Sequence, residues 1–209
     1  FGALGALALV LLGALAGRPH RDSDEFAANW VEIGPPHERF AARPAPALSP
    51  DGRQIAFWAM NQAGKVGLWI RSFDSPVARL LPGTDLENLN PGFAPFWSPD
   101  GRSLGFFAER RLKRIDVAAG NPLILADAGN PRGGSWGADG VIVFVPVTGG
   151  PVCRISASGG EVTPLPFYSE QNASGFRWPH FLPDGRHFLV NDRVDGHLFF
   201  GRKGNLFAQ

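Results

Sequence analysis

One stretch of this sequence has the spacing of a serine nucleophile. Gly133-Gly-Ser135-Trp-Gly137 matches G-x-S-x-G, in which a catalytic serine sits on a sharp turn between a strand and a helix. A hairpin-type turn, and not a helix, follows Ser135. We therefore interpret Ser135 as a strand residue and expect no catalytic serine here.

A second stretch, His20-Arg21-Asp22, has the residue order of the phosphotransferase catalytic loop H-R-D. That loop requires an asparagine five residues after its aspartate and a later Asp-Phe-Gly. Position 27 is Ala27, and the chain contains no Asp-Phe-Gly. We interpret this triplet as part of a charged linker.

The metal-ligating residue types are sparse. His180 and His187 flank a turn, but no third ligand with suitable spacing accompanies them. Cys153 is the only cysteine, which excludes a disulfide framework and a cysteine-rich zinc site. We predict an inert thiol at Cys153. We also expect no catalytic residue, no cofactor and no metal in this chain.

Four aspartates recur in the same context and resemble a carboxylate array only superficially. They lie 49, 39 and 45 residues apart, each in a turn of the type Pro-Asp-Gly. Proline presets φ, aspartate accepts bonds from nearby backbone N–H groups, and glycine adopts positive φ. We therefore predict structural repeat turns at Asp51, Gly52, Asp100, Gly101, Asp139, Gly140, Asp184 and Gly185. The copy at Asp139 departs from the others, with Gly-Ala in place of Ser-Pro.

The sequence around each turn has the parts of a β-hairpin. An apolar residue precedes each turn, and a short apolar strand follows it, for example Leu104-Gly-Phe106. Two weaker strand patterns come next, giving four short strands per repeat. A period of about 40 to 50 residues with four strands is typical of propeller blades. We predict an all-β fold, a partial β-propeller of about three and a half four-stranded blades over residues 41–209, with the fourth repeat cut off at Gln209.

The composition agrees with many short strands and turns. The 209 residues include 27 Gly, 19 Pro, 17 Phe and 6 Trp. Hydrophobic residues make up 44% of the chain, which is too many for a disordered one. The formal net charge of +1 provides no electrostatic footprint for a nucleic-acid partner.

The first residues have a different character. Residues 2–16 are apolar and uncharged, and charged residues follow from Arg18. We predict the C-terminal part of a transmembrane helix over residues 1–17, or alternatively a signal-peptide core cleaved after Ala16. Residues 18–40 are predicted to form a linker with a possible ring-closing strand at 30–33. The chain starts at Phe1 and its only methionine is Met60, so we expect it to be a fragment.

The turn motif Trp97-Ser-Pro-Asp-Gly-Arg102 and its copies resemble the TolB-type, WD-like β-propeller repeat. Further stretches, among them 131–136 and 177–188, are similar to the C-terminal region of bacterial membrane-anchored serine/threonine protein kinases. This resemblance implies a non-catalytic sensor or protein-interaction propeller outside the cytoplasmic membrane. It also implies a single-pass anchor and a kinase domain that these residues do not include.

The resemblance implies a protein or a small extracytoplasmic ligand bound on a propeller face. Two alternatives stay open. One is a secreted, TolB-like periplasmic binding scaffold. The other is the propeller domain of a prolyl-oligopeptidase-type serine hydrolase.

Overall fold

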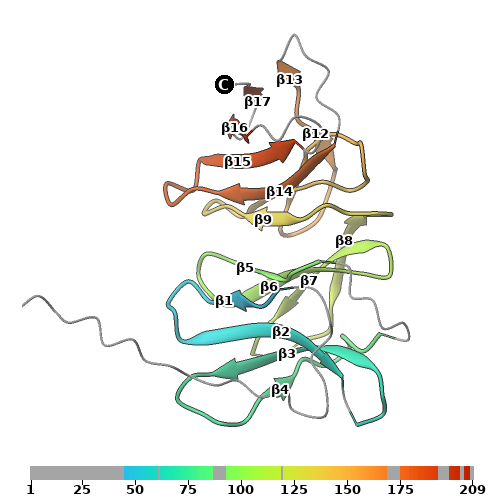
Figure 1. Ribbon diagram of the computed structural model, residues 1–209, viewed down its shortest axis with the longest axis vertical. Coiled ribbons are helices and arrows are strands. Elements are labelled where there is room, and N and C mark those ends of the chain that lie inside the picture. The colour runs from blue at the N-terminus through green and yellow to red at the C-terminus, as the bar shows by residue number, and fades with distance from the viewer. Residues whose placement is uncertain are drawn as a thin grey trace, which may run out of the picture. The chain divides into compact units, whose positions relative to one another are not determined.

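The described part of the chain is all-β. The computed structural model describes residues 45–60, 62–86, 93–118, 120–168, 175–192, 198–202 and 205–207. These residues form four sheets that follow one another in chain order (Figure 1). The predicted all-β class is therefore confirmed.

The first three sheets each contain four antiparallel strands in sequential order. The first sheet is built from β1 (Ala47–Leu48), β2 (Gln54–Met60), β3 (Val66–Ser72) and β4 (Arg79–Leu80). The second is built from β5 (Phe96–Trp97), β6 (Ser103–Ala108), β7 (Arg111–Asp116) and β8 (Leu123–Asp127). The third is built from β9 (Gly134–Trp136), β10 (Val141–Phe144), β11 (Cys153–Ser156) and β12 (Thr163–Pro164).

The fourth sheet is complete, and the expectation of half a blade was wrong. It contains β14 (Phe176–Phe181), β15 (His187–Asp192), β16 (Leu198–Arg202) and β17 (Asn205–Phe207), paired antiparallel in that order. The last two strands have five and three residues, so they fit in the residues before Gln209. A fifth strand, β13 (Phe167–Tyr168), pairs in parallel with β17. The outer edge of this blade is thus covered by a segment that precedes it in the chain.

The four repeat turns share one backbone geometry. In each, the glycine N–H donates to the carbonyl oxygen three residues earlier at 2.9–3.1 Å, as in Gly101 to Ser98. The four glycines have φ between 63° and 78°, a region open to glycine at little steric cost. The aspartate Oδ1 accepts a hydrogen bond from the backbone N–H two residues later.

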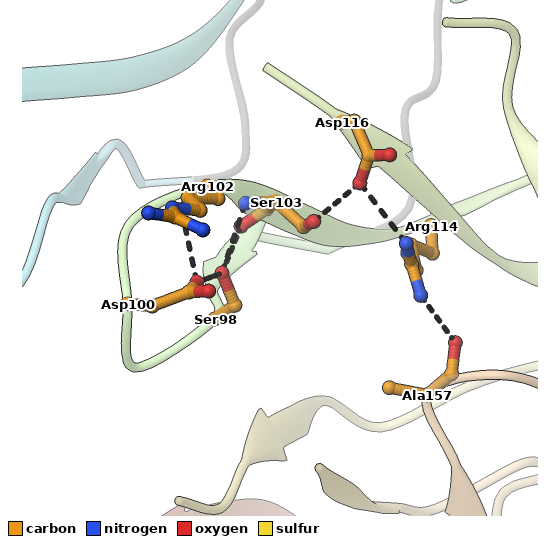
Figure 2. Close-up of polar contacts among 7 residues, drawn as sticks. All are labelled: Ser98, Asp100, Arg102, Ser103, Arg114, Asp116 and Ala157. Atoms are coloured by element: carbon orange, nitrogen blue, oxygen red, sulfur yellow. Dashed lines mark hydrogen bonds and ion pairs between the residues drawn. The ribbon is translucent and has the colours of Figure 1, made fainter. Parts of the chain in front are cut away.

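Polar side chains extend the second turn across its sheet. Figure 2 shows Ser98 Oγ donating to Asp100 Oδ1 at 2.6 Å, and Ser103 Oγ donating to Asp116 Oδ1 at 2.5 Å. Arg114 donates from Nη2 to Asp116 Oδ1 and from Nη1 to the carbonyl oxygen of Ala157, at 3.1 and 3.0 Å. Ala157 follows β11, so this arginine links the second blade to the third.

The hydrophobic core lies between consecutive blades. One cluster joins the first and second sheets, and Trp58 meets Phe106 edge to face within it, with ring centroids 5.9 Å apart. A second cluster joins Phe107 and Leu112 to Ile142 and Phe144, and a third joins the third sheet to the fourth. The short apolar strand after each turn is buried, as predicted. Each blade therefore depends on its neighbours for burial.

The predictions for the N-terminal part of the chain lie outside the described residues. These are the transmembrane or signal segment at 1–17, and the linker at 18–40 with its ring-closing strand at 30–33. Within the part that the structure describes, no helix has the length and apolar character needed to cross a membrane.

Candidate binding groove on the inner strands

The first strands of the four blades line one open groove of about 1110 Å³. Its walls come from β1, β5, β9 and β14, from the segments that lead into them, and from the turns that follow them. The repeat turns contribute Pro50, Pro99 and Pro183. Residues of the turn therefore line the groove at the C-terminal end of these inner strands, and the residues that precede the strand line it at the N-terminal end.

Hydrogen bonds align neighbouring inner strands. The N–H of Trp178 donates to the carbonyl oxygen of Arg132 at 2.7 Å, and the N–H of Phe181 donates to Ser135 Oγ at 3.0 Å. Both links join residues 46 positions apart in the chain. The chain therefore runs in the same direction through 132–135 and through 178–181, which include parts of β9 and β14. Trp97 makes a similar link, because its Nε1 donates to the carbonyl oxygen of Ala47 at 2.9 Å.

Two arginines and a phenylalanine occupy one level of the groove. Phe93, Arg132 and Arg177 each lie seven residues before the aspartate of their own turn, and all three line the groove. The guanidinium carbon of Arg132 is 5.7 Å from the centroid of the Phe93 ring, a cation–π distance. Nη1 of Arg132 donates to Asn130 Oδ1 and to the carbonyl oxygen of Pro131, both at 2.8 Å. These contacts hold one positive charge at the strand entrance.

Arg177 contributes the second guanidinium at this level of the groove. Its Nε is buried and has no hydrogen-bond partner among the described residues. A buried donor without a partner costs about 1–3 kcal/mol of folding free energy. An acceptor supplied by a ligand would remove that cost.

A bulge in β14 turns Trp178 toward the groove. Arg177 pairs with Asn191 and His180 with Leu189, so Trp178 and Pro179 together face a single residue of β15. Pro179 has no N–H for the ladder, and Trp178 adopts a φ of 53°, a region that a bulky residue rarely occupies. A β-bulge re-aims side chains, and here the indole lines the groove and is 59% exposed.

The groove is cationic and aromatic. None of the described residues that line it is aspartate or glutamate, whereas Arg132, Arg177 and His180 all line it. Aromatic rings are contributed at several levels by Phe93, Phe96, Trp97, Trp136, Trp178 and Phe181. This arrangement is suited to holding an anionic group beside an apolar ring.

The residues considered for catalysis have other surroundings. Ser135 lies in β9, is buried, and accepts the Phe181 N–H, as expected for a strand residue. Cys153 is buried in β11, and burial raises the pKa of its thiol, which disfavours the reactive thiolate.

His180 and His187 have different surroundings. His180 is in β14 and lines the groove, whereas His187 begins β15 and its Nδ1 lies 2.5 Å from Asp184 Oδ2. Within the described ranges, no three metal-ligating side chains gather in one place.

The turn aspartates are stabilised in their charged form by local hydrogen bonds. The Ser98 hydroxyl, followed by the Arg102 N–H, holds the pKa of Asp100 below its usual range. The Ser49 hydroxyl does the same for Asp51. In the fourth turn Leu182 replaces the serine, and the His187 ring takes over as the main cause that lowers the pKa of Asp184. A serine hydroxyl therefore stabilises the charged aspartate in the first two turns, and a histidine ring does so in the fourth.

The groove residues Arg132, Arg177 and Trp178 were not predicted as a site. The signal available was positional: the two arginines occupy the same place in consecutive repeats. That signal identifies a shared level but not the bulge that exposes Trp178, which depends on the pairing of β14 with β9 and β15.

Comparisons with known proteins agree with this fold. No protein-family model matches the chain, and no curated protein is significantly similar to it in sequence. TolB from Acinetobacter baumannii is 17% identical with a TM-score of 0.61, over 79% of this chain and 42% of that one. A putative TolB from Agrobacterium tumefaciens is 22% identical with a TM-score of 0.56, over 77% of this chain and 62% of that one.

The β-propeller domain of the trilobed protease from Pyrococcus furiosus is also similar. It is 14% identical with a TM-score of 0.52, over 82% of this chain and 57% of that one. At these identities the likeness shows the fold alone. The protein has a β-propeller fold, as predicted. The chain spans about two fifths to three fifths of the length of these structures.

Proposed function

We propose that this chain is a non-catalytic binding propeller whose ligand occupies the groove on the inner strands. The observation that carries the proposal is the pair formed by Arg177 and Trp178. One has a buried donor that lacks a partner, and the other is an exposed indole held by a strained bulge. Such strain clusters at functional sites.

The surroundings of the chemistry-bearing residues support binding over catalysis. The hydroxyl of Ser135 is occupied by a backbone N–H, and the turn aspartates accept bonds from their own turns. Among the described residues that line the groove, none is a carboxylate that could orient His180 as a general base.

For the whole protein, we propose the sensor region of a receptor-type bacterial serine/threonine protein kinase. The stretches at 96–108, 131–136 and 177–188 resemble the propeller region of such kinases. The propeller would lie outside the cytoplasmic membrane, and residues 1–17 would connect it to the kinase. Ligand binding on the propeller would then change the activity of the kinase through that single membrane-spanning segment.

Two alternatives are supported to the same degree by the structural likeness. The TolB structures favour a secreted periplasmic scaffold, and the propeller of the trilobed protease favours a domain that gates a serine hydrolase. The full open reading frame separates the three. A kinase domain before Phe1, a mature N-terminus at Gly17, or a hydrolase domain after Gln209 would each select one of them.

The placement outside the membrane is tested by external protease on spheroplasts. We expect the propeller to be cleaved in intact spheroplasts. Cleavage only after lysis would contradict this placement.

The groove is tested by a fragment screen using saturation-transfer NMR on the full chain. Trp178→Gly removes the indole while allowing the positive φ, and Val77→Ala is a control, since Val77 is 72% exposed and does not line the groove. We expect most fragments that bind the wild-type chain to be lost with Trp178→Gly and retained with Val77→Ala. Retention by both variants would contradict the proposal.

A further inference from the structure

We infer that the groove binds a small organic anion that carries one carboxylate and one aromatic ring. This inference rests on the proposed binding function, and it adds the chemical class of the ligand. It depends on three features of the groove: its charge, the free donor of Arg177 and the ring surface of Trp178.

The charge of the lining has one sign. Arg132 and Arg177 contribute two guanidinium groups, and the part of the lining that the structure describes contains no aspartate or glutamate. Guanidinium groups stay protonated at any physiological pH. The field inside the groove therefore attracts anions and repels cations, and low-dielectric walls of proline and aromatic side chains strengthen it.

The guanidinium of Arg177 has capacity for a new hydrogen-bond acceptor. Its Nε is buried without a partner in the described structure, and the planar guanidinium presents parallel N–H groups that match the two oxygens of a carboxylate. Arg132 lies on the adjoining segment, to which the Trp178 N–H is bonded at 2.7 Å. The two cationic residues therefore flank one region of the groove.

Trp178 places a flat apolar surface directly after Arg177 in the chain. The bulge exposes the indole in the groove, where Trp136 also contributes to the lining. An aromatic ring stacked on an indole is stabilised beyond what its buried area alone contributes. A ligand with a ring next to its carboxylate can use both residues at once.

The size of the groove fits this class. Pockets for small molecules enclose about 300–1,000 Å³, and this groove, at about 1110 Å³, is slightly larger and has room for such a ligand. An extended acidic peptide is the competing occupant, and the experiment below treats it as an outcome.

The test compares two probes of nearly equal shape by isothermal titration calorimetry on the full chain. 3-Phenylpropionate carries the carboxylate, and 3-phenylpropionamide replaces it with a neutral amide. We expect the carboxylate to bind at least about tenfold more tightly than the amide, because hydrogen bonds to a charged group are stronger than those to a neutral one. We also expect its affinity to fall with added salt, and that of the amide to stay constant.

Two variants locate the effect. Arg177→Gln should weaken 3-phenylpropionate binding by about tenfold or more and leave the amide unchanged. Arg111→Gln is the matched control, since Arg111 lies on the third strand β7, pairs with the exposed Asp127 and does not line the groove. It should change neither affinity.

Each outcome decides one point. Equal binding of the two probes, lost with Trp178→Gly, would overturn the anion while leaving the binding groove intact. Binding of an acidic peptide without binding of 3-phenylpropionate would overturn the small-molecule ligand. Failure of both probes to bind at about 10 mM, where even weak complexes of millimolar Kd form, would overturn the inference. Only loss of all fragment binding to the groove would also remove the proposed function.

Discussion

The backbone N–H of Trp178 donates a 2.7 Å hydrogen bond to the carbonyl oxygen of Arg132, joining two neighbouring inner strands. Because this N–H turns toward β9, it does not pair with β15, and the strand bulges at Trp178 and Pro179. The same bond thus aligns two blades and exposes the indole in the groove. The alignment of the two blades and the exposure of the indole therefore depend on one local distortion.

Gly133 makes this close approach possible. It has a φ of 99°, and a Cβ at this position would lie 3.2 Å from the Cα of Trp178. We predict that Gly133→Ala lowers the free energy of unfolding by about 1–3 kcal/mol more than Gly159→Ala does. Gly159 is the control because its φ is 92° but nothing lies within 4 Å of an added Cβ. Urea denaturation measures both, and equal costs would show that the contact with Trp178 is unimportant.

Phe96 covers a glycine on the neighbouring strand. Phe96 and Gly105 are cross-strand partners, and a Cβ added to Gly105 would overlap the Phe96 ring. We expect Gly105→Ala to lower the free energy of unfolding by about 1–3 kcal/mol, since overpacking forces side chains off their rotamers.

A double-mutant cycle with Phe96→Leu checks that cause. The cost of Gly105→Ala should be smaller when the ring is absent, because the two residues are in contact. An unchanged cost in the Phe96→Leu background would mean that the backbone of β6, and not the ring, requires glycine.

Ser135 is predicted to contribute to the stability of the fold and to take no part in catalysis. Its buried hydroxyl accepts the Phe181 N–H at 3.0 Å, so Ser135→Ala should cost about 1–3 kcal/mol by leaving that donor unpaired. Ser135→Thr keeps the hydroxyl and should cost less.

A second readout separates this role from catalysis. A fluorophosphonate probe should not label Ser135 in the wild-type chain. Labelling that disappears with Ser135→Ala would contradict the strand interpretation.

Asp100 is predicted to contribute stability that depends on pH. The Ser98 hydroxyl, the largest cause, and the Arg102 N–H lower the pKa of Asp100 in the folded state. A lowered folded-state pKa contributes stability above the unfolded-state value of about 4, and this is lost as pH falls through the folded-state value. Asp100→Asn should therefore cost about 0.5–1.5 kcal/mol at pH 7 and much less near pH 2.

Asp139 provides the comparison for Asp100. It accepts the Val141 N–H at the longer distance of 3.4 Å, and its turn has Gly137 where the second turn has Ser98. Denaturation at both pH values should show a smaller loss for Asp139→Asn than for Asp100→Asn. Equal losses in the two turns would show that the serine hydroxyl contributes nothing.

The repeat turns and buried second strands could be predicted because their causes are local. Pro99, Asp100 and Gly101 specify a turn within three residues, and the apolar run after it requires burial. The fourth blade was underestimated because β17 has only three residues, too few for periodicity to be recognised. β13 was missed because its pairing with β17 joins segments far apart in the chain.

The groove could be predicted only in part. The equal spacing of Arg132 and Arg177 from their turns is visible in the sequence. The φ of Trp178 and the unpaired Nε of Arg177 are not, since both follow from how β14 packs against β9 and β15. Bulges arise from tertiary pairing, and the local sequence around Pro179 shows only that a regular ladder is disfavoured.

The binding groove is tested most directly by hydrogen–deuterium exchange of the full chain with and without saturating 3-phenylpropionate. We predict added protection in peptides covering 130–136 and 175–183, which enter and form β9 and β14, and unchanged exchange in the outer strands β8 and β12. Protection confined to the outer strands, or no protection at 130–136 and 175–183, would contradict a ligand site on the inner strands.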